Sequence, residues 1–249
     1  MYQFFVEPHQ INVNDKSVII VGSDVNHIKN VLRMRVGEEI AVSNGQDGRE
    51  YRCGITAFKE EQVLCELRFI KEEGVELPAK VYLFQGLPKA DKMELIIQKA
   101  VELGAYQIIP VAAKRCVVKL DDKKARSKLV RWQGIAEAAA KQSKRAIIPQ
   151  VAEPVGFGEA VKLAAAMDVK LIPYELAEGM DRTKEIIGSL KGGQNIAVFI
   201  GPEGGFEEAE IEKAVSCGIE PITLGKRILR TETAGFTVLS WIMYQLEQS

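Results

Sequence analysis

The sequence is poor in the residues that bind metals or form disulfides. It has two histidines, His9 and His27, and four cysteines scattered along 249 residues without a C-x-x-C pair. Zinc sites need Cys and His ligands at short, repeated spacings, and this sequence has none. We therefore expect no metal site, and thiols that stay free in a reducing cytoplasm.

Long hydrophobic runs and a secretion signal are also missing. No stretch approaches the roughly 18 consecutive apolar residues of a membrane-spanning helix. The first ten residues, MYQFFVEPHQ, have no basic segment and reach Glu7 before an apolar run develops, so we predict no signal peptide. With 47% hydrophobic and 27% charged residues, the composition is that of a soluble globular protein of one or two domains. We expect no membrane contact and a cytoplasmic location.

A glycine-rich loop near the C-terminus lacks the lysine that a phosphate site needs. In NIAVFIGPEGGFEEAEIEKA (195–214) an apolar run leads into the glycines, and Glu203, Glu207 and Glu208 accompany them. Neither the P-loop nor the G-x-G-x-x-G spacing is present. Each carboxylate about 8 Å from a phosphate charge would cost roughly 2 kcal/mol, against ~1 kcal/mol gained from a helix N-terminus. A flat, neutral or cationic ligand such as S-adenosylmethionine fits this loop better than a phosphate does. A plain strand-to-helix turn is the alternative.

Net charge is close to zero but unevenly distributed. The chain carries −1 in total, while residues 114–145 contain eleven Lys/Arg against three Asp/Glu. Such asymmetry indicates a polyanionic partner, although a solvated helix face would also explain a basic run.

Residues 1–70 have the pattern of short strands joined by turns. The stretches SVIIVG and EEIAVSNGQDGREYRCGITAF are rich in β-branched residues, and SNGQDG carries tight-turn signals. One short helix is expected at DVNHIKNVLRM, capped by Asp24. These features predict a small β-barrel with one helix, followed by a polar linker at 71–80.

From Lys80 onward, strands alternate with helices. KVYLFQ, YQIIPV, VKLIPY, NIAVFI and PITLG are expected strands, and KMELIIQKAVELG is an expected helix that ends at Gly104. Such alternation predicts a parallel sheet covered by helices. The final segment, AGFTVLSWIMYQLEQ, is apolar on nearly all sides. It is therefore either the central helix of a monomer or a helix shared with a partner subunit.

A second charged loop, LGKRILRTETAG (224–235), also joins an expected strand to a helix that Thr231 or Thr233 could cap. It holds Lys226, Arg227, Arg230 and Glu232, which is more charge than a connector needs. Loops that follow neighbouring parallel strands can converge on one ligand.

Four segments together carry a family resemblance: KADKMELIIQKAVELG, EAAAKQSKR, FIGPEGGF and LGKRILRTETA. With them the chain resembles the knotted RNA methyltransferases of the SPOUT class, above all the bacterial family that methylates N3 of one uridine in 16S ribosomal RNA. The resemblance spans the whole chain. It implies a PUA-like, RNA-binding β-barrel over residues 1–72. It also implies an α/β domain over 73–249, with a parallel sheet in an α/β/α arrangement and a deep C-terminal trefoil knot.

The resemblance also implies the cofactor and the residues around it. The two loops would hold S-adenosylmethionine through Ile200, Gly201, Gly205, Leu224, Gly225, Ile228, Leu229 and Arg230. Methylation of uracil N3 needs loss of a proton and stabilisation of the resulting negative charge. Arg230 is the candidate charge stabiliser and Glu232 the candidate base or orienting group. The alternative for Glu232 is an ion pair with Arg230 or Arg227.

The expected partners are 16S ribosomal RNA, within the 30S subunit, and a second copy of the chain in a homodimer. RNA contacts are expected from eight basic residues: Lys29, Arg33, Arg35, Arg115, Lys123, Lys124, Arg126 and Arg145. Two alternatives stay open, which are a methyltransferase acting on tRNA or 23S rRNA, and a non-catalytic RNA-binding protein on the same scaffold. A nucleotide-dependent enzyme is disfavoured because the glycine-rich loop has no lysine.

Overall fold

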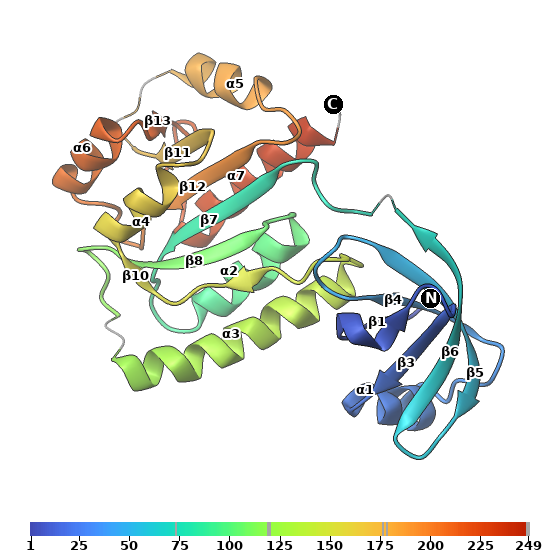
Figure 1. Ribbon diagram of the computed structural model, residues 1–249. Coiled ribbons are helices and arrows are strands. Elements are labelled where there is room, and N and C mark those ends of the chain that lie inside the picture. The colour runs from blue at the N-terminus through green and yellow to red at the C-terminus, as the bar shows by residue number, and fades with distance from the viewer. Residues whose placement is uncertain (73, 119–120, 176, 178, 248–249) are drawn as a thin grey trace. The chain divides into compact units, whose positions relative to one another are not determined.

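The computed structural model describes residues 1–249 except 73, 119–120, 176, 178 and 248–249 (Figure 1). The chain forms two compact units. The first comprises Met1–Glu76 and Ala140–Ile148, and the second Leu77–Ala139 and Pro149–Ser249. The chain thus passes between units within the segment expected to be a linker. Residues 140–148 join the first unit, although the expected boundaries assign them to the second domain.

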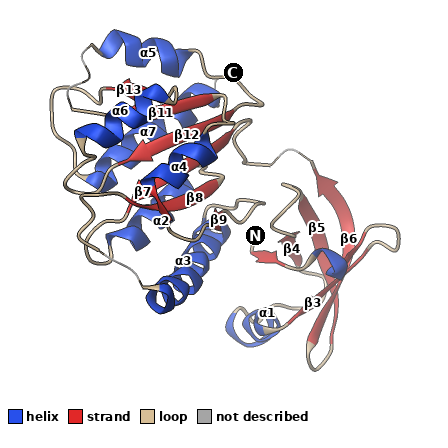
Figure 2. Ribbon diagram, turned by 60° about the vertical axis from the view of Figure 1, so that its left-hand side comes forward, coloured by secondary structure: helices blue, strands red, loops and turns tan. Residues whose placement is uncertain are grey.

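The first unit is built on a curled sheet of six strands that forms a half-barrel (Figure 2). Their spatial order is β1-β4-β5-β6-β3-β2; β1 runs parallel to β4, and all other neighbours are antiparallel. The strands are β1 (Gln3–Phe5), β2 (Ile11–Asn12), β3 (Ser17–Val21), β4 (Glu39–Ser43), β5 (Glu50–Phe58) and β6 (Gln62–Lys71). In β6 the residues Val63, Cys65 and Leu67 are buried and alternate with more exposed ones, so one face of the strand supplies the core.

The predicted turn between β4 and β5 is confirmed. The side-chain oxygen of Asn44 accepts hydrogen bonds from the backbone N–H groups of Gln46 and Asp47, both at 3.0 Å. Gly45 and Gly48 adopt φ of +73°, a conformation that costs glycine little.

The predicted helix of the first unit is present, but its predicted cap is wrong. A helical turn, α1 (Ser23–Asn26), continues into a π-helical turn, η2 (His27–Val31), and a 3-10 turn, η1 (Pro8–Gln10), precedes β2. Gly22 is the capping residue, and Asp24 lies inside the first turn. The Asp24 carboxylate lies 3.9 Å from the ammonium of Lys141 instead. Tertiary charge pairing has thus replaced the local cap.

The second unit contains an all-parallel, seven-stranded sheet. The spatial order is β10-β8-β7-β12-β11-β13, and β9 also pairs with β8. The strands are β7 (Lys80–Gly86), β8 (Gln107–Ala112), β9 (Gln150–Val151), β10 (Val155–Gly156), β11 (Val169–Pro173), β12 (Asn195–Ile200) and β13 (Glu220–Ile222). The α/β class with a parallel sheet is therefore confirmed.

Helices lie on both faces of this sheet, as an all-parallel sheet requires. They are α2 (Lys92–Glu102), α3 (Asp122–Gln142), α4 (Phe157–Ala164), α5 (Met180–Gly188), α6 (Glu208–Ser216) and α7 (Thr231–Leu246). Helices α4 and α6 pack on one face, where they share a core with β7, β8, β11 and β12. Helix α7 packs against β12, α2 and α5. Gly104, at φ +87°, ends α2 as predicted.

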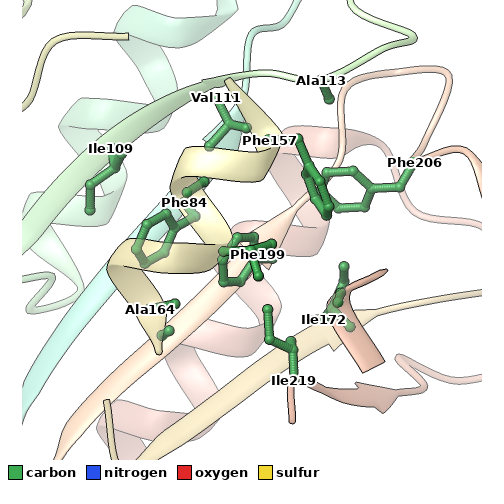
Figure 3. Close-up of a cluster of buried hydrophobic side chains, with 14 of the residues drawn as sticks. Phe84, Ile109, Val111, Ala113, Phe157, Ala164, Ile172, Phe199, Phe206 and Ile219 are labelled. Atoms are coloured by element: carbon green, nitrogen blue, oxygen red, sulfur yellow. The ribbon is translucent and has the colours of Figure 1, made fainter. Parts of the chain in front are cut away.

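Aromatic rings connect the core to the glycine-rich loop (Figure 3). Phe84 of β7 and Phe199 of β12 stack, with ring centroids 4.4 Å apart. Phe157 of α4 contacts both Phe199 and Phe206, at centroid distances of 6.2 and 5.2 Å. Phe206 is the last residue of GPEGGF and is buried. The loop is therefore anchored in the core at its C-terminal end.

Candidate functional site

A cavity of about 540 Å³ opens where five parallel strands of the second unit end. The loops after β11, β12 and β13 form most of its wall, and Lys92 and Arg115 contribute from the segments after β7 and β8. The carboxyl edge of a parallel sheet is the usual binding edge in such folds. The eight residues expected to hold a cofactor all line this cavity: Ile200, Gly201, Gly205, Leu224, Gly225, Ile228, Leu229 and Arg230.

The GPEGGF loop makes a tight turn that depends on its glycines. The Gly205 N–H donates to the Pro202 carbonyl at 2.9 Å, and Gly205 has φ of +67°. A side chain on Gly201 would lie 3.1 Å from the Gly205 Cα, which is too close without a shift. Since Gly205 has open space on its own side-chain position, the turn presents bare backbone to the cavity.

The acidic residues of this segment have partners other than a ligand. The backbone N–H of Glu207 donates to the Glu210 carboxylate at 2.9 Å, and the N–H of Lys114 donates to the same carboxylate at 2.9 Å. These bonds fix the start of α6. The Glu210 carboxylate therefore serves loop geometry.

Glu203 is held by the segment that precedes α2. Its carboxylate accepts the Lys89 N–H at 3.1 Å and lies 3.2 Å from the Lys92 ammonium. Partial burial works to raise the pKa of Glu203, but hydrogen bonds from its own backbone N–H, from Lys92 and from Lys89 outweigh it, and the pKa is lowered. The pKa of Lys92 is raised, first by its hydrogen bond to Glu203. Both groups are therefore charged at neutral pH.

Glu232 is the second carboxylate partner of Lys92. Its Oε2 atom lies 3.3 Å from the Lys92 Nζ atom. Glu232 occupies the first turn of α7 and is not among the cavity-lining residues, whereas Lys92 is. The ion pair of Glu232 thus forms with Lys92, and not with Arg230 or Arg227, which were named as the alternative to a role as base. One ammonium bridges the two loops through two glutamates.

The second loop presents charge and one bare apolar side chain. Lys226, Arg227 and Arg230 are exposed, and Ile228 is 88% exposed. Gly225 has φ of +101°, and its N–H donates to the Thr223 hydroxyl at 3.3 Å. Arg230 occupies the capping position of α7 without a side-chain cap, so the prediction of Thr231 or Thr233 as cap is wrong.

Thr231 instead takes part in a buried chain of hydrogen bonds. Its hydroxyl donates to the Gly201 carbonyl at 2.6 Å and accepts from the Gln85 side-chain amide at 2.9 Å. Gln85 and Thr231 are 0% and 5% exposed. The chain thereby links β7, the GPEGGF loop and the start of α7.

The eight basic residues expected to contact RNA differ in their surroundings. Arg33, Arg35, Lys123, Lys124 and Arg126 are exposed. The Lys29 ammonium donates to the backbone carbonyls of Lys59 and Glu60. Arg115 lines the cavity and donates to the Gly204 carbonyl at 3.0 Å.

Arg145 is the exception, because it is buried. It is 3% exposed, and its guanidinium binds the Glu76 carboxylate through both Nε and Nη2. A guanidinium paired in this way has no free face for a phosphate, so Arg145 does not belong to an RNA surface.

Sequence reasoning missed several residues of the site. Tyr174 and Thr223 line the cavity, and Lys92 bridges the loops. Tyr174 and Thr223 each follow the end of a parallel strand, a placement that could have identified them. Nothing in the local sequence signals the pairing of Lys92 with residues far along the chain.

Among the residues that the structure describes, no group of three or more His, Cys, Asp or Glu side chains is placed to hold a metal ion. Over the same part of the chain, no helix is both long and apolar enough to cross a membrane.

Two protein-family models match this chain. Residues 75–243 match the RNA methyltransferase domain model, and residues 20–68 match the RNA methyltransferase PUA domain model. The chain belongs to the RNA methyltransferase family defined by these two domains.

The relatives of this chain include ribosomal RNA small subunit methyltransferases. The chain is 41% identical to the ribosomal RNA small subunit methyltransferase E of Bacillus subtilis (strain 168), over 99% of this chain and 98% of that protein. It is 35% identical to the protein of the same name from Mesomycoplasma hyopneumoniae (strain 232), over 96% and 98%. A crystal structure of the Neisseria gonorrhoeae protein of that name, bound to S-adenosyl methionine, superposes with a TM-score of 0.83 at 31% identity, covering 98% and 97% of the two chains.

Proposed function

We propose that this chain transfers a methyl group from S-adenosylmethionine to N3 of one uridine in 16S ribosomal RNA, within the 30S subunit. The observation that carries the proposal is the cavity at the carboxyl edge of the sheet, walled by the GPEGGF loop and the second charged loop (224–235), in a chain of the RNA methyltransferase family. The full-length likeness to the small subunit methyltransferases supports the choice of RNA.

The residues present fit S-adenosylmethionine. The cavity volume of about 540 Å³ lies within the range of roughly 300–1,000 Å³ usual for small-molecule sites. Gly205 and Gly225 have left-handed φ values and open space at the side-chain position, so backbone groups can approach a flat ring. Ile200, Leu224 and Leu229 line the same wall and supply apolar contact. When bound, this cofactor supplies an electrophilic methyl group on a positively charged sulfur.

Within the proposal, Arg230 stabilises the negative charge that spreads over the uracil oxygens when N3 loses its proton. Its exposed side chain at the cavity rim supports this role. Glu232 orients the rim through Lys92, since its carboxylate is engaged by that ammonium. Near-normal turnover of a Glu232→Gln variant would exclude Glu232 as the base.

RNA binding is assigned to the basic residues that remain exposed. These are Arg33 and Arg35 on the first unit and Arg115, Lys123, Lys124 and Arg126 on the second; Lys29 on the first unit is half-buried. The first unit thereby acts as the RNA-binding domain, in line with its match to a PUA model. A cytoplasmic location follows from the ribosomal substrate.

The knot and the homodimer belong to the same proposal. Helix α7 packs against α2 and β12, and the Thr231 hydroxyl at its start donates to the Gly201 carbonyl of the GPEGGF loop. These contacts hold the C-terminal part of the chain against that loop, which supports the knot. On α7, Tyr244 is 65% exposed, and Phe236, Trp241 and Met243 are half-buried. These side chains support a contact with a second copy. Light scattering of the purified chain would give its mass.

The test is methyl transfer from labelled S-adenosylmethionine to 30S subunits and to naked 16S RNA, both from cells that lack this activity. We expect N3-methyluridine at one site, identified by mass spectrometry of the digested RNA, with a preference for 30S subunits. Cofactor binding without transfer to either substrate would retain the site and reject the RNA target, and tRNA and 23S rRNA would be assayed next. Absence of cofactor binding would reject the proposal as a whole.

A further inference from the structure

Three segments that are distant in sequence meet below the cavity. Gln85 is the penultimate residue of β7, Gly201 follows β12, and Thr231 is the first residue of α7. Gly201 and Thr231 line the cavity, whereas Gln85 does not. Any effect of Gln85 on a bound molecule must therefore pass through its two partners.

The donor and the acceptor of each hydrogen bond that joins Gln85, Thr231 and Gly201 can be assigned from the protons available. The Thr231 hydroxyl has one proton, which it donates to the Gly201 carbonyl at 2.6 Å, so it must accept from Gln85. The Gln85 amide nitrogen also donates to the Gly86 carbonyl at 3.0 Å. Since both partners of that nitrogen act as acceptors, the side-chain amide can adopt only this orientation.

The other end of the Gln85 amide shows that this position is not optimised for stability. Its oxygen, Oε1, is buried and has no hydrogen-bond partner among the described atoms. A buried acceptor without a partner carries a desolvation cost. Its neighbours on the strand, Leu83 and Phe84, are apolar and fully buried, and an apolar side chain would avoid that cost. A polar residue that breaks the local pattern in this way marks a functional constraint.

The Gly201 peptide links Gln85 to the cavity, because Gly201 lines the cavity and accepts the hydrogen bond from Thr231. A side chain on Gly86 would lie 2.6 Å from Pro202, so the end of β7 and the GPEGGF loop are already in contact. Turning the Gly201 carbonyl would break the bond from Thr231. It would also shift a residue that lies close to the Gly205 backbone, since a Cβ on Gly201 would be 3.1 Å from the Gly205 Cα. One carbonyl thus sets the position of both loops.

We infer that Gln85 is a positioning residue of the cofactor site: through the Thr231 hydroxyl it fixes the Gly201 carbonyl and so holds the GPEGGF loop and the second charged loop (224–235) in register. The inference rests on the proposed function, because the loops are assigned to S-adenosylmethionine there. Gln85 and Thr231 act as a unit, and neither needs to touch the cofactor through its side chain.

The experiment compares Gln85→Met, Thr231→Val and Thr231→Ser with the wild-type chain. The methionine has a similar length without polar atoms, the valine removes the hydroxyl, and the serine keeps it. We expect the dissociation constant and the KM for S-adenosylmethionine to rise about tenfold in Gln85→Met and Thr231→Val. We expect kcat at saturating cofactor to change about twofold at most, and Thr231→Ser to restore near wild-type binding. The double variant should bind the cofactor no more weakly than either single variant, since both substitutions break the same series of hydrogen bonds.

Val161→Ala is the matched control for stability. Val161 is 2% exposed in α4 and lies away from the cavity lining, so its truncation should lower the unfolding temperature without changing cofactor affinity. The inference is overturned if Gln85→Met binds the cofactor as the wild-type chain does. It is also overturned if Val161→Ala weakens binding as much at equal loss of stability, because the role is then only structural. Failure of the wild-type chain to bind the cofactor would reject the proposed function, and this inference with it.

Discussion

At Gly86 the approach of two backbones leaves no room for a side chain. A Cβ atom there would lie 2.6 Å from both the backbone nitrogen and the Cδ of Pro202. Neither atom can swing away, since Pro202 is buried at the start of the GPEGGF turn. We predict that Gly86→Ala displaces this loop and weakens S-adenosylmethionine binding by at least tenfold, measured by calorimetric titration. Gly134→Ala is the control, because Gly134 is exposed in α3 with open space around it. That variant should bind normally and gain about 0.5–1 kcal/mol of stability. Normal binding by Gly86→Ala would show that the turn moves freely.

Lys92 gives a prediction for pH dependence. Its ammonium helps to lower the pKa of Glu203 below the ordinary 4.5. The carboxylate is therefore more easily ionised in the folded chain than in the unfolded one. Its stabilising effect is present at neutral pH and is lost as the pH falls through the acidic range below 4.5. We predict that Lys92→Met raises the pKa of Glu203, measured by carboxyl-carbon NMR titration. An unchanged pKa would assign the shift to the backbone N–H groups of Glu203 itself and of Lys89.

The limits of sequence reasoning are visible at the level of the residue. The cavity-lining glycines were predictable because they stand together in two short motifs at the ends of strands. Lys92 was not, since its partners, Glu203 and Glu232, lie more than a hundred positions away in the sequence. Arg145 was misjudged for the same reason. Its charge suggested a surface, and only the fold brings it to Glu76.

At the level of elements, periodicity predicted more than local capping rules did. The five predicted strands of the second unit and the predicted helix that ends at Gly104 are present, because each buries one face. The two-residue strands β9 and β10 were not predicted. The predicted caps at Asp24 and Thr231 are wrong, because tertiary partners, Lys141 and Gly201, take their side chains. The separation of residues 140–148 from the second unit was also not predictable, since no change in composition marks it.

The segment 140–148 depends on one half-buried carboxylate, that of Glu76. Glu76 accepts the Arg145 guanidinium and also the backbone N–H groups of Ala146 at 3.0 Å and Ile147 at 3.2 Å. Glu76→Ala would leave a buried charge and two donors without this partner. We predict a loss of about 3–5 kcal/mol in the stability of the first unit.

Hydrogen exchange measured by mass spectrometry on peptides from β5 and β6 would follow that unit alone. Tryptophan fluorescence would not, since both tryptophans, Trp132 and Trp241, belong to the second unit. Glu72→Ala is the matched control. Glu72 is 63% exposed and pairs with Arg49, so its loss should cost less than about 1 kcal/mol. Equal exchange in the two variants would mean that the Arg145 pair does not stabilise the unit.

For the whole molecule, the distribution of charge matters more than its sum. A chain with net charge −1 can bind a polyanion only where positive side chains gather and remain unpaired with carboxylates. Arg145 lies within the basic window of residues 114–145 but is neutralised by Glu76, so counting charges along the sequence overstates the surface. The exposed side chains of Lys123, Lys124 and Arg126, close together in the sequence of the second unit, are the better measure. Lys124 lies 3.3 Å from the Asp121 carboxylate, but both side chains are exposed, and such surface pairs are weak.

Replacing these three residues by glutamine should reduce the salt dependence of RNA binding. Each phosphate contact adds about 0.7–0.9 to the slope of log affinity against log salt concentration, so the loss of three contacts should lower the slope by roughly 2–3. Filter binding of 16S RNA over a salt series would measure it. S-adenosylmethionine affinity should stay the same, because none of the three residues lines the cavity. A control variant with glutamine at Lys162, Lys184 and Lys191, three exposed lysines of the same unit, loses the same charge outside the basic window. If both variants lower the slope equally, binding follows net charge alone, and the exposed window is not the RNA surface.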